Sequence, residues 1–304
     1  MNLRVEVIEY LEYCTFRKSL SKNTMKAYRI DLRQFLEFVA GTTEPGKRQI
    51  EAYITDLHKQ YQQRTIKRKL ASIKAFYTYL EEEERIRENP FRKIRIKFKE
   101  KKTLPRIIPR KEIEQMLRSM YRTKPEGARR KTWLRDLSVV ELCFATGARV
   151  GEISRIGAGN VNLDTGVIRI MGKGGRERDI HIGSESVLSL LRTYYEANRE
   201  AIRRSGSFFV SQRGNRFSEQ SIRLMMKKYA KQAGIERTIT PHMFRHSFAT
   251  YLIEAGADIS YVKELLGHSS IRTTQIYIHL AAHKKAEILR ELHPRHQMNI
   301  GPAA

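Results

Sequence analysis

The amino-acid sequence predicts a mainly α-helical protein with one small antiparallel β-sheet, arranged as two domains. Apolar residues recur at helical spacing through most of the 304 residues. Residues 160–183 alternate instead between apolar and polar positions and contain two glycine-bearing turn signals. A basic, proline-containing segment separates two helical regions, and a chain of this length has room for more than one hydrophobic core.

Composition restricts the class of protein. The chain carries a formal net charge of +25 and an isoelectric point near 10.1, which predicts a polyanionic partner, with nucleic acid favoured over an anionic membrane surface. No apolar run approaches the ~20 residues of a membrane-spanning helix, and the acidic residues Glu6, Glu9 and Glu12 do not fit a signal peptide. Two cysteines, Cys14 and Cys143, are too few for a disulfide framework or a zinc site. We therefore expect a soluble cytoplasmic protein.

Residues 1–95 are expected to form a helical domain. Ser21 or Asn23 has the residue type of a helix N-cap, and the apolar residues that follow it recur at helical spacing. Two further helices are predicted at residues 49–61 and 64–80. These amphipathic helices can bury their apolar faces in one shared core.

The helix predicted at residues 64–80 has two different faces. Apolar residues fall on one side, whereas the other side is basic, and no acidic residue of the helix precedes Glu81. A solvated charged face is the usual explanation of such a pattern. The lack of acidic partners favours a DNA-binding face instead. Its candidate residues are Arg64, Lys67, Arg68 and Lys74.

A strongly basic segment follows the first domain. Residues 92–111 contain ten basic residues and one acid, Glu100. Pro105 and Pro109 favour an extended conformation. A solvated linker is the simplest interpretation, but a basic linker between two basic domains also fits a path along a phosphate backbone, where neutralised phosphates release counterions.

The second domain is expected from residue 109 to residue 304. It contains the predicted β-sheet, whose hairpins turn at residues 164–166 and 172–175. A short helix is predicted over ARVGEISRI, residues 148–156. Longer helices are predicted at residues 111–121, 132–145, 184–204 and 218–233, and the second of these stops at Gly147.

Residues 241–280 combine cations, imidazoles and a candidate reactive tyrosine. His242 and Arg245 are three positions apart and share one face of a predicted helix. A glycine ends a second helix and places His268 in a turn, and Tyr277 follows between two isoleucines. This pattern suggests a site that holds an anionic group beside a phenol.

Each of these residues also has an ordinary explanation. The histidines can be packed core residues or metal ligands, but no carboxylate or cysteine lies at ligand spacing near them, and Arg245 would repel a cation. Upstream, Arg149 and Glu152 are three positions apart, which fits a simple ion pair on a helix. Lys173, in the motif GKGG, fits an ordinary lysine at a hairpin tip. We therefore expect no metal. These residues indicate a functional site only when they are considered together.

The order of the motifs carries a resemblance to a known family. TGARVGEISRI comes first, then GKGGRERDI, then PHMFRHSFATYL, then LLGHSSIRTTQIYIHL. In these motifs the chain resembles the tyrosine recombinases, also called phage-type integrases, and most closely their Xer subgroup. The likeness extends over residues 1–295. It implies a SAM-like helical core-binding domain at 1–95, a basic linker at 96–108 and a tyrosine-recombinase catalytic domain at 109–304.

The resemblance implies a role for each residue of the set. Tyr277 would attack the scissile DNA phosphate and form a 3′-phosphotyrosyl bond, which stores the bond energy for rejoining. Arg149 and Arg245 would hold the non-bridging oxygens, where negative charge grows in the transition state. Glu152 would orient the cluster, with the plain ion pair as its alternative.

Further roles complete the implied mechanism. Lys173 would protonate the leaving 5′ oxygen, His242 would act as the base near the tyrosine, and His268 would hydrogen-bond the phosphate. Arg176 and Arg178, which follow the hairpin tip, would contact the DNA backbone, with a solvated strand as the alternative. The implied enzyme uses neither a metal nor a cofactor such as ATP.

The implied function is site-specific recombination of duplex DNA by a nucleoid-associated homotetramer, through a Holliday junction. A C-terminal helix at residues 281–292 would pack into a neighbouring subunit. The sequence is compatible with resolution of chromosome or plasmid dimers and with integration of a mobile element, with or without a paired recombinase or accessory protein. The alternatives are a type IB topoisomerase, a non-catalytic DNA-binding protein, and a basic protein that binds RNA or a membrane surface.

Overall fold

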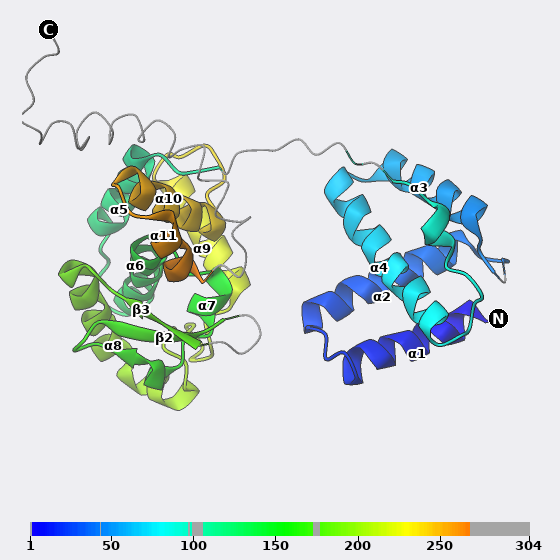
Figure 1. Cartoon of the computed structure of the whole chain (residues 1–304). Coiled ribbons are helices and arrows are strands. Elements are labelled where there is room, and N and C mark those ends of the chain that lie inside the picture. Colours follow the sequence, from blue (N-terminus) through cyan, green and yellow to red (C-terminus); the bar gives the residue numbers. More distant parts are fainter. Residues whose placement is uncertain (1, 43, 97, 99–105, 173–176, 268–304) are drawn as a thin grey trace, which may run out of the picture. The chain divides into compact units, whose positions relative to one another are not determined.

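The structure of the chain is a computed structural model that describes residues 2–42, 44–96, 98, 106–172 and 177–267. The chain divides into two compact units, Met1–Lys102 and Thr103–Ala304, and each is described by itself (Figure 1). Among the described residues, no helix combines the length and apolar character that crossing a membrane requires.

The first unit is helical, as predicted. Its elements in chain order are α1 (Leu3–Phe16), α2 (Lys22–Phe38), α3 (Lys47–Gln60), α4 (Gln63–Glu82) and the 3-10 helix η1 (Pro90–Lys93) (Figure 1). Ser21 is confirmed as the N-cap of α2, because its side chain accepts a hydrogen bond from the backbone N–H of Thr24 at 3.2 Å.

The core of the first unit is rich in aromatic side chains. The ring of Tyr10 in α1 lies 5.4 Å from the ring of Phe76 and 5.1 Å from that of Tyr79, both in α4. Phe35 of α2 packs edge-on against Tyr53 of α3 at 5.2 Å. All of these rings are buried. The helices therefore share one core, which accounts for the apolar stripes that predicted them.

The second unit is mainly helical and carries a small sheet. Its elements are α5 (Arg110–Arg122), α6 (Arg129–Thr146), α7 (Val150–Ser154), η2 (Ala158–Asn160), β1 (Val161–Asn162), β2 (Val167–Met171), β3 (Glu177–His181), α8 (Glu185–Ser205), α9 (Glu219–Gln232), α10 (Pro241–Glu254) and α11 (Ile259–Leu266). In the middle lies α6, packed against α5, α8, α9 and α10 (Figure 1). Leu137 and Val140 are fully buried there, and Trp133 and Cys143 are buried with them. A helix covered on all sides is apolar on all sides, which fits the continuous run around Cys143.

The described residues contain the predicted antiparallel sheet, with three strands in the order β1-β2-β3. Strand β2 pairs with β3 so that Ile168 faces Ile180 and Ile170 faces Arg178. The three isoleucines are buried. One face of the sheet is therefore part of the core, and Arg178 lies on the strand position that belongs to this face.

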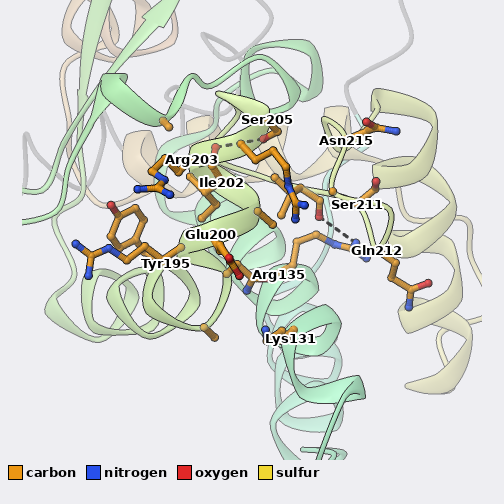
Figure 2. Close-up of a pocket in the computed structure, with 18 of the residues that line it drawn as sticks. Lys131, Arg135, Tyr195, Glu200, Ile202, Arg203, Ser205, Ser211, Gln212 and Asn215 are labelled. Atoms are coloured by element: carbon orange, nitrogen blue, oxygen red, sulfur yellow. Dashed lines mark hydrogen bonds between the residues drawn. The ribbon is translucent and has the colours of Figure 1, made fainter.

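A cleft of about 1390 Å³ lies between the N-terminal part of α6, the C-terminal part of α8 and the loop at residues 210–215 (Figure 2). The buried Arg135 lines it and donates to Oδ1 of Asp136 from Nε at 2.9 Å and from Nη2 at 2.6 Å. Its Nη1 donates to the carbonyl of Val210 at 3.2 Å, and the hydroxyl of Tyr229 donates to Oδ2 of Asp136 at 3.2 Å. This buried network joins α6, α9 and the loop.

Replacing Asp136 by alanine is expected to lower the free energy of unfolding by about 3–5 kcal/mol, because it leaves the Arg135 guanidinium buried without its carboxylate. Chemical denaturation of the full chain measures this loss. Asp179→Ala is the matched control, since Asp179 pairs with Arg169 on the exposed side of the sheet at 3.2 Å. That exposed pair is worth about 0–1 kcal/mol. Equal losses in the two variants would contradict the structural role of the network.

Candidate active site

The site begins where α6 ends. Gly147 is the C-cap of α6 in the left-handed conformation, with φ of +60°. A Cβ atom at this position would lie 2.5 Å from Cδ1 of Phe248 and 3.0 Å from Cδ2 of Leu266, so the backbone conformation and the space both require glycine. The sharp turn places Arg149 at the start of α7, as the stop predicted at Gly147 implied.

Arg149 and Glu152 form the ion pair that their spacing suggested. Nη1 of Arg149 donates to Oε1 of Glu152 at 2.8 Å, and the backbone N–H of Arg149 donates to Oε2 at 2.8 Å. The Glu152 side chain is only 2% exposed, whereas that of Arg149 is 36% exposed. The carboxylate is therefore an interior group that fixes both the helix start and one side of an accessible guanidinium.

Arg178 of β3 binds the same carboxylate. Its Nη1 donates to Oε1 of Glu152 at 3.0 Å and its Nη2 donates to Oε2 at 2.9 Å. Burial alone would raise the pKa of Glu152, but the hydrogen bonds from Arg178 and Arg149 outweigh it and hold the pKa below its usual range. The carboxylate consequently stays ionised at neutral pH, and its pairing is lost only as the pH falls through this lowered pKa.

Arg245 of α10 reaches two helix ends. This helix begins with Thr240 as its N-cap and Pro241 in its first turn. The guanidinium of Arg245 is buried, and it donates to the carbonyl of Gly147 at 2.9 Å and to the carbonyl of Leu266 at 2.6 Å. Arg245 thereby ties α10 to the end of α6 and to the end of α11.

Gly267 closes the group. It is the C-cap of α11 with φ of +59°, as the predicted stop at this glycine implied. Its carbonyl accepts a hydrogen bond from Nη2 of Arg149 at 3.3 Å. The structure therefore brings together Arg149, Glu152 and Arg245, which are separated by up to 96 positions in the sequence.

His242 lies one turn before Arg245 and is exposed. Burial of part of the ring, followed by the charges of Arg245, Arg223 and Arg149, lowers the pKa of His242 below its ordinary value of 6.5. His246, one turn further on, has its pKa lowered by burial and then by His242 and Arg245. Both imidazoles are therefore neutral at pH 7, which is the state that a base requires.

If His242 is the base, as the resemblance implies, the rate of DNA cleavage should fall on acidification only below pH 6.5, because protonation of His242 at its lowered pKa removes that base. The free energy of unfolding should fall over the same range, since the unfolded chain binds this proton more tightly than the folded chain. Single-turnover cleavage rates measured from pH 5 to pH 8 test the first statement. The acid limb should disappear in His242→Gln and persist in His246→Gln. A midpoint above pH 6.5 would contradict the assignment.

The other residues predicted from the sequence fall into two groups. Lys173, Arg176, His268 and Tyr277 lie outside the described residues. On α4, Arg64 and Lys74 are exposed. The amine of Lys67 lies 5.1 Å from the centre of the Phe98 ring. These cations stay candidates for DNA binding.

Arg68 has a partner that the sequence did not reveal. It forms an ion pair with Asp31 of α2, which is fully buried. Lys69 lies 3.4 Å from the same carboxylate, and the hydroxyl of Ser72 donates to it at 2.9 Å. The interpretation of this face as one without acidic partners is wrong at Arg68, because the acid comes from another helix. Arg68 therefore helps to hold α2 against α4.

Arg178, which was predicted to contact the DNA backbone, has a partner within the chain. Both terminal nitrogens of its guanidinium are bound to Glu152, and the side chain is only 18% exposed. The sequence contains one signal for this inward orientation of Arg178. In the strand ERDIH, Arg178 and the apolar Ile180 are two positions apart and so lie on the same face of the sheet.

Among the described residues, no group of three or more histidine, cysteine, aspartate or glutamate side chains is arranged to bind a metal ion. The two cysteines are buried and unpaired. Burial raises the pKa of the Cys143 thiol, which makes it a poor nucleophile.

The fold and the site define the class of protein. Two guanidinium groups bind carbonyls at the ends of α6 and α11, and the neutral imidazole of His242 lies one turn before Arg245. This arrangement suits phosphodiester chemistry. Residues 106–284 match the model of the phage integrase family, and residues 7–84 match the model of its N-terminal SAM-like domain. The chain belongs to the phage integrase family and is a Xer-like tyrosine recombinase. As a member of this class, it is a site-specific recombinase.

Relatives of similar length support this membership. A tyrosine recombinase of Agathobacter rectalis is 45% identical over 300 residues, covering 97% of this chain and 98% of the relative. Tyrosine recombinase XerC of Leptospira interrogans is 34% identical over 294 residues, covering 94% and 92%. The likeness extends through both units.

Solved structures share the fold. XerH recombinase bound to palindromic difH in a post-cleavage complex aligns with a TM-score of 0.75 and 21% identity, covering 92% of this chain and 83% of XerH. A lambda integrase tetramer bound to a Holliday junction aligns with a TM-score of 0.68 and 17% identity, covering 90% of this chain and 76% of the integrase chain.

Proposed function

We propose that this recombinase cuts and rejoins duplex DNA through a covalent bond between Tyr277 and a 3′ phosphate, with Arg149 and Arg245 holding the phosphate. The observation that carries the proposal is the connection between the two arginines. Arg245 binds the carbonyls of Gly147 and Leu266, and Arg149 binds the carbonyl of Gly267. These hydrogen bonds attach both arginines to the same helix ends, so their relative position is fixed before DNA binds. Electrostatic catalysis depends on such preorganisation.

The proposed reaction exchanges one phosphodiester for another. The phenol oxygen of Tyr277 attacks phosphorus and loses its proton to His242, while the bond to the 5′ oxygen breaks and that oxygen takes a proton from Lys173. Negative charge on the non-bridging oxygens is stabilised by Arg149 and Arg245. The phosphotyrosyl bond keeps the energy of the original bond, so a 5′ hydroxyl from another strand reverses the reaction without ATP.

The roles of Lys173, Tyr277 and His268 rest on the motifs that carry them. His268 follows Gly267 directly in the sequence, and we assign it a hydrogen bond to the phosphate. We also propose that residues 1–95 form the core-binding domain, residues 96–108 a basic linker along the DNA, and residues 109–304 the catalytic domain. Arg64, Lys67, Lys74 and Arg176 are proposed to bind the DNA backbone.

A covalent-capture experiment tests the proposal. Genomic DNA from the organism that encodes the chain is sheared, incubated with the full chain in the presence of a chelator, and denatured in detergent. Fragments that remain joined to protein are then sequenced. We expect the junctions to converge on one short sequence or a few, with the protein attached to the 3′ end.

Other outcomes favour the alternatives. Adducts spread over many sequences, together with relaxation of supercoiled plasmid, would indicate an activity like that of type IB topoisomerases. DNA binding without any adduct would indicate a non-catalytic DNA-binding protein. Loss of the adduct in the presence of a chelator would point to a metal-dependent reaction.

The recombinase is further proposed to act as a homotetramer that exchanges strands through a Holliday junction, in the cytoplasm on the nucleoid. The lambda integrase tetramer on such a junction supports this assembly. We assign the helix predicted at residues 281–292 to the contact between subunits. Deleting residues 281–304 should therefore weaken assembly on paired DNA sites at least tenfold and leave binding to a single site nearly unchanged. Gel-shift titrations measure both, and unchanged assembly would contradict the assignment.

The similarity to XerC supports a Xer-like role. We propose either resolution of chromosome or plasmid dimers or integration of a mobile element, with or without a second recombinase. The sequence recovered by covalent capture distinguishes the two roles. A site near the chromosomal replication terminus indicates dimer resolution, whereas a site at the ends of a mobile element indicates integration.

A further inference from the structure

We propose that Arg178 is a positioning residue of the cleavage site, which holds Glu152 so that Arg149 keeps both its orientation and its charge for the DNA phosphate. The inference rests on the proposed function and adds to it a residue that never needs to contact DNA. Its basis is the geometry around a single buried carboxylate.

The strand directs Arg178 toward the interior. It shares one face of β3 with the buried Ile180, and across the sheet it pairs with the buried Ile170. Its guanidinium therefore approaches Glu152 from the side of the sheet, whereas Arg149 approaches from the start of α7. The sheet and the helix are joined at this carboxylate.

Each carboxylate oxygen of Glu152 accepts two hydrogen bonds. Oε1 accepts from Nη1 of Arg149 and from Nη1 of Arg178, and Oε2 accepts from the backbone N–H of Arg149 and from Nη2 of Arg178. The fork of Arg178 fixes both oxygens at once, which no lysine can do. Without it, the carboxylate can rotate about its last bond and carry the Arg149 guanidinium away from its place.

Charge supplies the second part of the argument. With Glu152 alone, the charge of Arg149 would be balanced by a carboxylate 2.8 Å away. Arg178 adds a second positive charge to the same carboxylate at 2.9 Å, so the group of three has a net charge of +1. The exposed edge of Arg149 thus faces the DNA with an uncompensated charge.

Arg178 also packs against the chain end of α11. A Cβ atom on Gly267 would lie 2.9 Å from Nη1 of Arg178 and 3.0 Å from its Cζ, so the guanidinium lies directly against this glycine. Gly267 in turn binds Arg149 and immediately precedes His268. Arg178 therefore contacts, directly or through Glu152, the segments that lead to both Arg149 and His268.

One feature of Arg178 costs stability. Its Nε–H is buried and has no hydrogen-bond partner among the described residues, and an unsatisfied buried donor lowers the stability of the fold. An arginine kept in spite of this cost fits a functional role better than a purely structural one. A backbone contact to DNA is disfavoured, because both terminal nitrogens would have to leave Glu152.

The test compares Arg178→Ala and Arg178→Lys with the wild-type chain on the duplex recovered by covalent capture, nicked next to the cleavage position to trap the adduct. At saturating DNA, we expect cleavage to slow by about 10–100-fold in Arg178→Ala, the range typical of supporting residues behind a reactive group. Arg178→Lys should recover only part of this loss. The matched control is Arg169→Gln, a neighbouring exposed arginine on β2, which should cleave at the wild-type rate.

The binding measurement separates positioning from DNA contact. The Kd for a single site, and its dependence on salt, should be the same for Arg178→Ala and wild type. A lost phosphate contact would instead reduce the slope of log Kd against log salt by about 0.9. Thermal unfolding checks that each variant is folded, and if Arg178→Ala is not, Arg178→Lys carries the comparison.

A double variant identifies the group through which Arg178 acts. Arg149→Ala should be slow by itself, and adding Arg178→Ala should slow it by less than about twofold, because residues that act as a unit are not additive. Additive losses, an unchanged rate in Arg178→Ala, or a reduced salt slope would each overturn the inference while the proposed function stands. A wild-type chain that forms no adduct would instead remove the proposed function, and the inference with it.

Discussion

Replacing Tyr277 by phenylalanine is expected to abolish the covalent protein–DNA adduct, a loss of about 10⁴-fold or more. The change removes one oxygen atom, and that oxygen is the proposed nucleophile, so no phosphotyrosyl bond can form. Binding should survive, because the arginines, the basic surface and the helices are unchanged. Denaturing gels measure the adduct on the nicked duplex, and gel-shift titrations measure the Kd.

Tyr261 provides the matched control for this experiment. It is a tyrosine of α11, 60% exposed, and it lies sixteen positions before Tyr277. Tyr261→Phe should form the adduct at the wild-type rate. An adduct that persists in Tyr277→Phe would place the nucleophile elsewhere, and mass spectrometry of the DNA-linked peptide would show which residue carries the phosphate.

Replacing Arg245 by alanine should produce the second large effect. We expect cleavage at saturating DNA to slow by about 10²–10³-fold, because the change removes a proposed fixed donor to the developing charge. Stability should fall as well, by about 1–3 kcal/mol for each carbonyl left without a donor, and these are the carbonyls of Gly147 and Leu266. Single-turnover cleavage and chemical denaturation measure the two effects separately.

Arg245→Lys distinguishes charge from geometry. Lysine keeps the positive charge but lacks the planar fork that reaches two carbonyls, so most of the loss in rate should remain. Arg237→Lys is the control, since Arg237 is partly exposed and pairs with Glu112 at 2.7 Å. A wild-type cleavage rate in Arg245→Lys would mean that the charge alone is sufficient.

Periodicity predicted most of the helices because most of them bury a stripe of their own residues, whereas α6 is covered on all sides. The N-cap at Ser21 and the stops at Gly147 and Gly267 were also visible in the sequence, since local backbone geometry restricts the residue types there. The pair of Arg149 and Glu152 was predictable for the same reason, because both belong to one turn of helix.

Contacts between elements were not predictable in this way. Asp31 and Arg68 are 37 positions apart, and Glu152 and Arg178 are 26 positions apart, so no local pattern joins them. The acceptors of Arg245 are backbone carbonyls, which leave no trace in the residue type. The sequence thus indicated which side chains take part in the site, while packing decides what each of them binds.

The two arginines of the site are anchored by different kinds of group. Arg149 binds the carbonyl of Gly267, but its shorter side-chain hydrogen bond is to Glu152, a carboxylate that acid can neutralise. Arg245 depends on carbonyls at the ends of α6 and α11, which carry partial negative charge and do not titrate. Acidification through the lowered pKa of Glu152 should therefore loosen one arm of the proposed phosphate clamp and leave the other in place. The position of Arg149 therefore depends on pH through Glu152, whereas the position of Arg245 depends on the fold alone.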